Sequence, residues 1–378
     1  MHPGGPRRDS VAILRGADLC RVGPLCYSGR RGDRLRRRHQ MDLLGEAMSA
    51  GPIDTPLTRA LGIEVPLICG AMYPCTDPEL VAAVSEAGGI GIVQPMALTY
   101  VHGLDYREGL RRIRQLTDKP IGVNLIMEKS AKVYEDRLRR WLEISLEEGV
   151  RFFVTSLGKP DLVVEKAHAV GGLVYHDVTE RKWAERALQG GVDGLICVNR
   201  DAGGHPGRIT AEEQIETMGD LGVPLVCAGG VGDERTFVRM LGLGFAGVQM
   251  GTRFIATREC KVHDDYKQAI VRARSADIVW TDKISGVPVA VINTPYVQKM
   301  GVSAGPIARR LLGHSRTKHW MRMFYTVQSL WRLKRIISRG SVYADYWQAG
   351  RSVEGVVAIE SAADVVDRFA AAARGVEA

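Results

Sequence analysis

Short apolar runs recur at regular intervals along the middle of the chain, and amphipathic stretches separate them. The runs are rich in Val, Ile and Leu with little polar alternation, which is typical of strands buried on both faces of a parallel sheet. They lie at 65–70, 89–95, 120–127, 151–157, 172–178, 192–198, 223–229 and 245–251. The stretches between them predict helices at 77–87, 106–116, 132–148, 160–169, 179–189, 210–221 and 233–243.

Local signals support these boundaries. Asp77 followed by Pro78 is a helix start, and glycines recur where most of the helices would end, just before the next strand. Strands that alternate with helices predict parallel βαβ units. Eight such units favour a closed (β/α)8 TIM barrel over an open doubly wound sheet, and no GxGxxG sequence follows the first strand to support a dinucleotide-binding fold.

The pattern predicts four segments. Residues 1–50 are basic and predict a disordered N-terminal extension, either a transit peptide or sequence upstream of a true start at Met41 or Met48. Residues 51–258 form the barrel, and 259–345 predict a helical, basic subdomain that acts as an insertion or lid after strand 8. Residues 346–378 predict a C-terminal segment whose amphipathic helix packs back on the barrel.

Charge is concentrated in two places. The formal net charge is +8; residues 1–40 contribute +7 and residues 306–340 contribute +9, so the rest of the chain carries −8. A nucleic-acid face spread over the whole protein is therefore not expected. The basic stretch 306–340 interleaves apolar residues with Arg and Lys, and predicts either a solvated helical face or a landing site for an acidic partner or an anionic membrane surface.

Cysteine usage and hydropathy place the protein in a broad class. The seven cysteines are an odd number and form no CxxC pair, and several lie in apolar runs, which indicates a reducing, cytoplasmic compartment rather than a disulfide framework. No zinc spacing is present, so no metal site is predicted. No apolar run approaches the roughly 18 residues of a membrane span. Whether the protein is a homo-oligomer is left open.

Candidate chemistry gathers at the carboxyl ends of the predicted strands, where barrel active sites lie. Strand 6 runs into a loop, 199–207, that holds three glycines and His205. A histidine there can exchange a proton near neutral pH, so His205 is the candidate acid or base. His176 at the end of strand 5 competes for that role. Asp177 beside it could orient an imidazole, contact a cofactor or cap the next helix, and capping is also open for Thr179.

The glycine turns after strands 7 and 8 predict a phosphate site. Gly229 and Gly230 follow strand 7, and Gly251 with Thr252 follows strand 8. Backbone N–H groups in such turns can surround a phosphate without obstruction. Asn124, within strand 3, offers a donor and an acceptor to a ring edge such as that of a flavin. Structural roles are also open for these residues. Asn124 could be a buried side chain satisfied by backbone groups. Met72 could pack on a ring or plug the barrel mouth, and Gln249 could bridge strands.

The motifs at these strand ends resemble one family. They are GAMYP (70–74), GVNL (122–125), DAGGHPG (201–207), AGGVGD (228–233) and MGTRFIATREC (250–260). Their combination is similar to that of the nitronate monooxygenases, also known as 2-nitropropane dioxygenases, which are relatives of the flavin-dependent enoyl-ACP reductases. The resemblance covers roughly 55–260, with a weaker echo at 346–350.

The resemblance implies a barrel that binds FMN non-covalently, with His205 as the catalytic histidine that faces the substrate. It implies FMN contacts from Ala71, Met72, Asn124, Gly203, Gly230, Gly251 and Thr252. Enzymes of this kind oxidise alkyl nitronates with O2 to a carbonyl compound and nitrite. Here Asp177 stands where such members often have lysine, and the loop before AGGH lacks the usual glycine and glutamate. These departures leave the substrate open. An NAD(P)H-dependent enoyl-ACP or enoyl-CoA reductase is the alternative, because the basic stretch 306–340 would suit an acidic acyl carrier protein or the phosphates of coenzyme A. A barrel retained only for binding is a third possibility.

Overall fold

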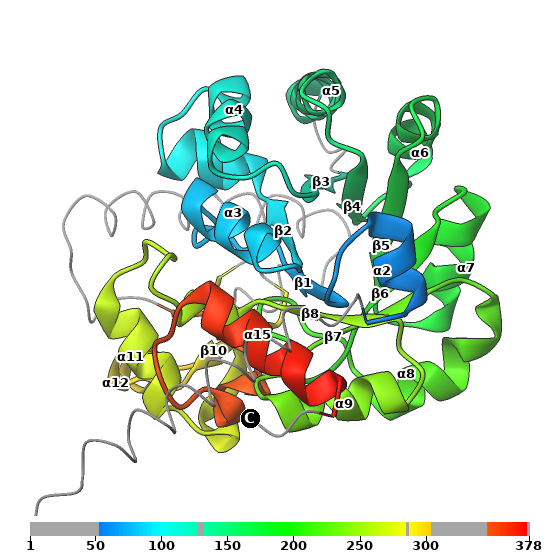
Figure 1. The fold of residues 1–378 in the computed structure, drawn as a ribbon. Helices are drawn as coiled ribbons and strands as arrows, with labels where there is room; N and C mark the ends of the chain where they lie inside the picture. The colour runs from blue at the N-terminus through cyan, green and yellow to red at the C-terminus, as the bar shows by residue number, and fades with distance from the viewer. Residues whose placement is uncertain (1–52, 128–131, 285–286, 304–345, 376–378) are drawn as a thin grey trace, which may run out of the picture. The chain divides into compact units, whose positions relative to one another are not determined.

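The eight apolar runs form a closed parallel barrel in the computed structural model, which describes residues 53–127, 132–284, 287–303 and 346–375 (Figure 1). Each strand pairs with the next one in the chain, and the last pairs with the first, with Ile68 opposite Gln249. The prediction of a TIM barrel is confirmed. The strands are β1 (Leu67–Cys69), β2 (Ile90–Val93), β3 (Ile121–Ile126), β4 (Phe152–Ser156), β5 (Leu173–Val178), β6 (Gly194–Val198), β7 (Leu225–Ala228) and β8 (Gly247–Met250).

Helices between successive strands cover the outside of the barrel (Figure 1). The predicted start at Asp77 is confirmed, because its carboxylate accepts a hydrogen bond of 2.9 Å from the amide of Leu80. The helical elements up to β8 are α2 (Pro56–Leu61), α3 (Pro78–Glu86), the π-helical η1 (Ala97–Val101), α4 (Tyr106–Leu116), α5 (Lys132–Glu147), α6 (Asp161–His168), α7 (Arg181–Gln189), α8 (Ala211–Met218), the 3-10 turn η2 (Gly219–Leu221) and α9 (Glu234–Gly242).

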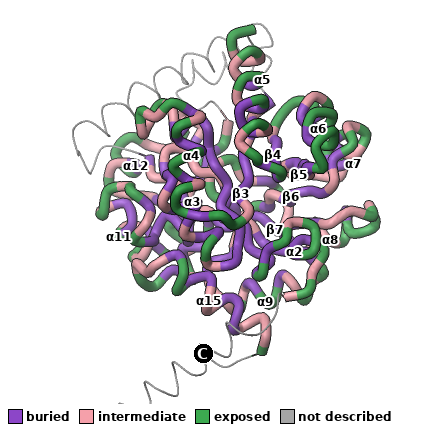
Figure 2. The backbone as a smooth tube through the Cα atoms, turned by 45° about the horizontal axis from the view of Figure 1, so that its top comes forward, coloured by how far each residue is buried: buried purple, intermediate pink, exposed green. Residues whose placement is uncertain are grey.

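Strand side chains alternate between the barrel interior and the layer under the helices. One buried cluster fills the interior and includes Ile68, Val154 and Tyr175, while a second, larger cluster lies between the strands and the helices. Leu57 of α2 belongs to the interior cluster and so closes the amino-terminal end of the barrel. In Figure 2 the strands are buried and the exposed segments follow the helices. The interior is therefore a packed core, and only its carboxyl end is open to chemistry.

The segment after β8 departs from the predicted helical subdomain. It begins with α10 (Thr252–Ile255) and α11 (Asp264–Arg272), as expected of helical sequence. It then contains a two-stranded antiparallel sheet, so this part of the predicted helical subdomain 259–345 is not helical. The apolar four-residue strands are too short for periodicity to separate them from helix. The elements are η3 (Ser275–Asp277), β9 (Ile278–Thr281), β10 (Val289–Ile292) and α12 (Pro295–Met300).

The C-terminal segment supplies the missing eighth barrel helix. After η4 (Arg351–Gly355), the helix α15 (Ala362–Ala373) packs between α9 and α3 (Figure 1). Buried Arg253 stabilises this return, since it donates to the Ala358 carbonyl at 3.0 Å and to the Glu360 carboxylate at 2.7 Å. The predicted barrel boundary of 51–258 is thus too narrow, because the barrel closes only with a helix from the chain end.

Several expectations fall outside the described residues. The extension 1–50 and the basic stretch 306–340 both lie there, and the described residues all belong to one compact unit, Ala47–Ala378. The five described cysteines are free and buried. Within the described ranges, no helix is long and apolar enough to cross a membrane.

Candidate active site

The loop after β6 is held in shape by Asn199, which is almost completely buried. The Asn199 amide group donates to the Gly229 carbonyl at 3.0 Å, and its side-chain oxygen accepts from the Asp201 amide at 2.9 Å. Its backbone carbonyl accepts from the Gly207 amide at 3.0 Å, which closes the loop around His205. Asn199 therefore ties the loop after β6 to the turn after β7.

His205 stands at the carboxyl-end rim of the barrel. The preceding residue, Gly204, has a left-handed backbone (φ +68°), and its carbonyl accepts a hydrogen bond of 2.7 Å from the Ala290 amide of β10. His205 is exposed at this rim, and the protein on its inner side lowers the pKa of its imidazole by desolvation. The imidazole is therefore neutral at pH 7 and able to accept a proton.

The two neighbours on β5 point to opposite sides of the strand. His176 lies in the layer outside the barrel, where its Nδ1 is 2.8 Å from the Thr155 hydroxyl, and burial lowers its pKa to about 4. Asp177 has the same orientation as Tyr175, which belongs to the interior cluster. Asp177 does not cap a helix, because it lies within β5 and the N-cap position of α7 is Glu180. His176 therefore does not reach the barrel mouth, whereas Asp177 faces it.

Two buried side-chain oxygens near the mouth have no partner. Asn124 of β3 pairs with Val154, an interior residue, and shares the inward orientation of the β3 positions 122, 124 and 126. The side-chain oxygens Oδ1 of Asn124 and of Asp177 are both buried without a hydrogen bond to any described group. Burial also raises the pKa of the Asp177 carboxyl to about 7. Unpaired buried oxygens are costly, so this pair indicates a bound group that supplies hydrogen-bond partners.

The turn after β7 requires glycine. Gly229 and Gly230 have φ values of +121° and +79°. A Cβ on Gly229 would lie 2.3 Å from Oδ1 of Asn199 and 2.6 Å from the amide nitrogen of Ala202. The backbone there is left-handed and pressed against the β6 loop, which is the form of a turn whose N–H groups can line an anion site.

The end of β8 lies against two distant segments. The Thr252 hydroxyl accepts a hydrogen bond of 3.0 Å from the Gly350 amide, so its own hydrogen remains for a ligand. A Cβ on Gly251 would lie 3.2 Å from the Met72 sulfur, and a Cβ on Gly203 would lie 2.8 Å from the Gly350 nitrogen. The structure therefore brings together the ends of β1, β6 and β8 and the segment before η4.

The remaining predicted residues are also at this rim. Ala71 is half-buried beside the interior cluster. Gln249 lies over Gly70, whose added Cβ would be 2.9 Å from Cγ of Gln249, and no described residue is a hydrogen-bond partner of its amide. Gln249 thus does not bridge strands within the described chain. The contact of Gly350 with Thr252 was not predicted from the sequence. The only signal for it is the weak motif at 346–350, which does not specify the partner.

These residues fit FMN. The Asn124 oxygen, which has no hydrogen-bond partner among the described residues, suits a ring N–H group, and the glycine turns after β7 and β8 suit a phosphate. Among the residues that the structure describes, no group of His, Cys, Asp or Glu could hold a metal ion. The arrangement defines a β/α-barrel protein with a cofactor-type site at the carboxyl ends of its strands.

Comparison with known proteins identifies the family. The nitronate monooxygenase family model matches residues 54–372, so the chain belongs to that family and is an oxidoreductase of its kind. A Rhodococcus jostii protein named (3aS,4S,5R,7aS)-5-hydroxy-7a-methyl-1-oxo-octahydro-1H-indene-4-carboxyl-CoA dehydrogenase is 30% identical over 247 residues, 65% of this chain and 67% of its own length. The Pseudomonas aeruginosa nitronate monooxygenase is 30% identical over 272 residues, 61% of this chain and 77% of its own.

A solved structure agrees with the fold. FabK from Thermotoga maritima superposes with a TM-score of 0.70 at 28% sequence identity, and the match covers 85% of this chain and 97% of that one. The family and its relation to FabK-type enzymes, both expected from the motifs, are thereby confirmed.

Proposed function

We propose that the barrel mouth binds FMN non-covalently. The observation that carries this proposal is the pair of unpartnered buried oxygens on Asn124 and Asp177, which face the same mouth as the glycine turns. The phosphate would be held by backbone N–H groups and one hydroxyl, and the ring would lie against small and apolar residues. The residues assigned to FMN are Ala71, Met72, Asn124, Asp177, Gly203, Gly229, Gly230, Gly251 and Thr252.

We further propose that the enzyme oxidises alkyl nitronates with O2. FMN supplies the electron acceptor when it is bound. His205 binds the nitro group of the substrate through its imidazole, and removes the α-proton when a neutral nitroalkane enters. Its lowered pKa keeps it unprotonated for this step. In the overall reaction the C–N bond is broken: two nitronates and one O2 give two carbonyl compounds, each with an oxygen atom from O2, and two nitrite ions.

Asp177 adjusts this site. A carboxyl whose pKa is about 7 is protonated in a large fraction of molecules at neutral pH, so it can donate a hydrogen bond where a lysine would place a charge. An ionised Asp177 would oppose negative charge on the ring. The protonated form is thus the one that favours cofactor reduction, and reduction becomes less favourable above neutral pH.

A second candidate is a redox reaction of an acyl-CoA thioester. The relative from Rhodococcus jostii is named as the dehydrogenase of a carboxyl-CoA compound, and its sequence identity to this chain, 30%, equals that of the Pseudomonas aeruginosa nitronate monooxygenase. In that case His205 would exchange a proton at the carbon next to the thioester carbonyl, which is the same acid–base task on a different substrate.

Anaerobic titration separates the candidates. The FMN-loaded protein is mixed with propionate-3-nitronate, with NADPH or with an acyl-CoA, and flavin absorbance is followed. Rapid bleaching by the nitronate supports the first candidate, and bleaching by NADPH or the acyl-CoA supports the second. A colourless protein that cannot be reconstituted with FMN would contradict both and leave a binding protein.

A further inference from the structure

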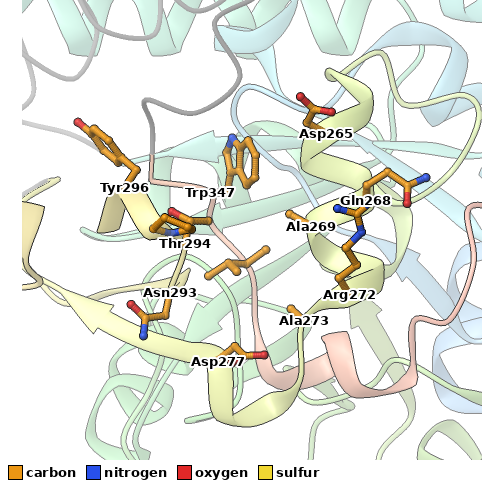
Figure 3. Close-up of a pocket in the computed structure, with 12 residues that line it drawn as sticks. Asp265, Gln268, Ala269, Arg272, Ala273, Asp277, Asn293, Thr294, Tyr296 and Trp347 are labelled. Atoms are coloured by element: carbon orange, nitrogen blue, oxygen red, sulfur yellow. The ribbon is translucent and has the colours of Figure 1, made fainter. Parts of the chain in front are cut away.

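A cavity of about 350 Å³ lies in the segment inserted after β8 (Figure 3). We call it the insertion cavity. Its walls come from α11, the end of β10, the start of α12 and Trp347, and its polar and aromatic lining includes Arg272, Asp277, Asn293, Tyr296 and Trp347. The volume is at the lower end of the range that small-molecule sites occupy, enough for one nucleoside-sized group.

The aromatic wall of the insertion cavity is fixed in place. Trp347 stacks on Tyr266 with ring centroids 5.5 Å apart and an angle of 13°. Tyr296 meets the ring of Tyr346 edge-on, also at 5.5 Å. Both lining rings are half-buried and held from behind, so a flat ligand that contacts them requires little ordering of the protein.

The polar lining has groups that find no partner among the residues that the structure describes. Arg272 is exposed at the end of α11 and has no ion-pair or hydrogen-bond partner among the described residues, whereas nearby Arg274 lies 3.8 Å from Glu354. A free guanidinium suits a phosphate. The Asn293 side-chain amide is also unused within the described chain, and suits the edge of a base.

Carboxylates in the same lining exclude a simple anion as the ligand. Asp277 is held by a hydrogen bond of 2.8 Å from the Arg274 amide, and its second oxygen has no partner in the described ranges. Asp265 lies on another wall. Two carboxylates beside one guanidinium would repel inorganic phosphate, but they accept hydrogen bonds from sugar hydroxyls. The lining thus fits a ligand with a flat base, a ribose and a phosphate.

We propose that the insertion cavity binds the adenosine phosphate part of a nucleotide, with the base on Trp347 and Tyr296, the ribose on Asp277 and the phosphate on Arg272. This site goes beyond the proposed flavin reaction. It is connected to the active-site loop: Ile292, in the cavity wall, donates to the Trp347 carbonyl at 2.9 Å, and Ala290 on the same strand holds Gly204. Coenzyme A and NADPH both carry the required group.

Calorimetric titration of the FMN-loaded full-length protein with ADP and with adenosine tests the proposal. We expect wild-type protein to bind ADP. Arg272→Ala should weaken ADP binding about tenfold and leave adenosine binding unaffected, whereas Trp347→Ala should weaken the binding of both ligands. The matched control is Arg274→Ala, a neighbouring arginine outside the lining, which should leave ADP binding within about twofold of wild type. Absence of ADP binding, or equal losses in the two arginine variants, would overturn the proposal.

The same titration with coenzyme A and with NADPH identifies the source. If Arg272→Ala weakens the binding of coenzyme A, the site is assigned to a CoA thioester. If it weakens the binding of NADPH, the site is assigned to the reductant. If neither is weakened, the proposal fails. The flavin spectrum is recorded in every sample, so loss of the nucleotide site is distinguished from loss of the flavin site.

Discussion

The carbonyl of Gly204 accepts a hydrogen bond of 2.7 Å from the amide of Ala290, so the residue before His205 is paired with a strand of the insertion. The same strand pairs with β9 on its other edge, through residues such as Val291 opposite Val279. The insertion is therefore part of the active-site rim. It fixes the backbone next to His205, the residue that we propose to be catalytic.

Ala290→Pro tests this coupling, because proline lacks the N–H that Gly204 accepts. We expect turnover to fall about tenfold or more, since small displacements of a catalytic group are expensive. Steady-state kinetics at matched FMN content is the measurement. Ala290→Gly keeps the amide and is the control; equal activity of the two variants would mean that the pairing does not position His205.

Asp177→Asn should stabilise the flavin-free protein in a pH-dependent manner. The folded pKa of about 7 lies above the unfolded value near 3.9, so the folded state binds the extra proton between these values and stability falls as pH rises through them. Above neutral pH the ionised group costs about 2–4 kcal/mol, and below about pH 4 it costs nothing. Thermal unfolding at about pH 8 and pH 4 should therefore show a gain only at the higher pH. The same gain in stability at both pH values would show that the pKa of Asp177 is not raised in the folded protein.

Gly229→Ala should abolish FMN binding or unfold the turn after β7. The added Cβ meets fixed atoms of Asn199 and Ala202, and the backbone is left-handed, so the cost combines a clash with strain. Gly244→Ala is the matched control, because its φ is +104° but nothing lies within 4 Å of an added Cβ. It should lose about 1–2 kcal/mol of stability and keep the flavin. Similar FMN affinities in the two variants would count against the phosphate site.

Thr252→Val should weaken FMN binding about tenfold. Valine has the same shape but leaves the buried Gly350 amide without its acceptor, a loss of about 1–3 kcal/mol. It also removes the hydroxyl proposed to reach the phosphate. Fluorescence titration with FMN measures the effect, and Thr252→Ser should restore most of the affinity. If the valine variant bound FMN with wild-type affinity, Thr252 would not be part of the FMN site.

Much of the fold follows from local sequence. Buried strands, amphipathic helices and glycine stops repeat in a regular order, so β2 through α9 could be predicted with boundaries close to those observed. The β9–β10 pair could not, because four apolar residues fit either a strand or a helix until the partner strand is known. The place of α15 as the eighth barrel helix depends on packing against α9 and α3, which no local pattern encodes.

The candidate site also has a part that the sequence predicts and a part that it does not. Residues at strand ends, such as Asn124 and Gly229, could be predicted because barrel topology gathers those ends. The sequence alone left His176 in competition with His205, since a one-residue change in register decides which strand residues face the barrel interior. The Thr252–Gly350 contact spans 98 positions, and only the folded chain reveals it.

Turnover of propionate-3-nitronate by His205→Asn, beside wild type at equal FMN content, tests the central claim most directly. We predict that both proteins are yellow with the same flavin spectrum, and that kcat of the variant falls about 100-fold or more because the imidazole is lost from a site that is otherwise intact. Unchanged turnover in the variant, or a wild-type protein that holds no flavin, would contradict it.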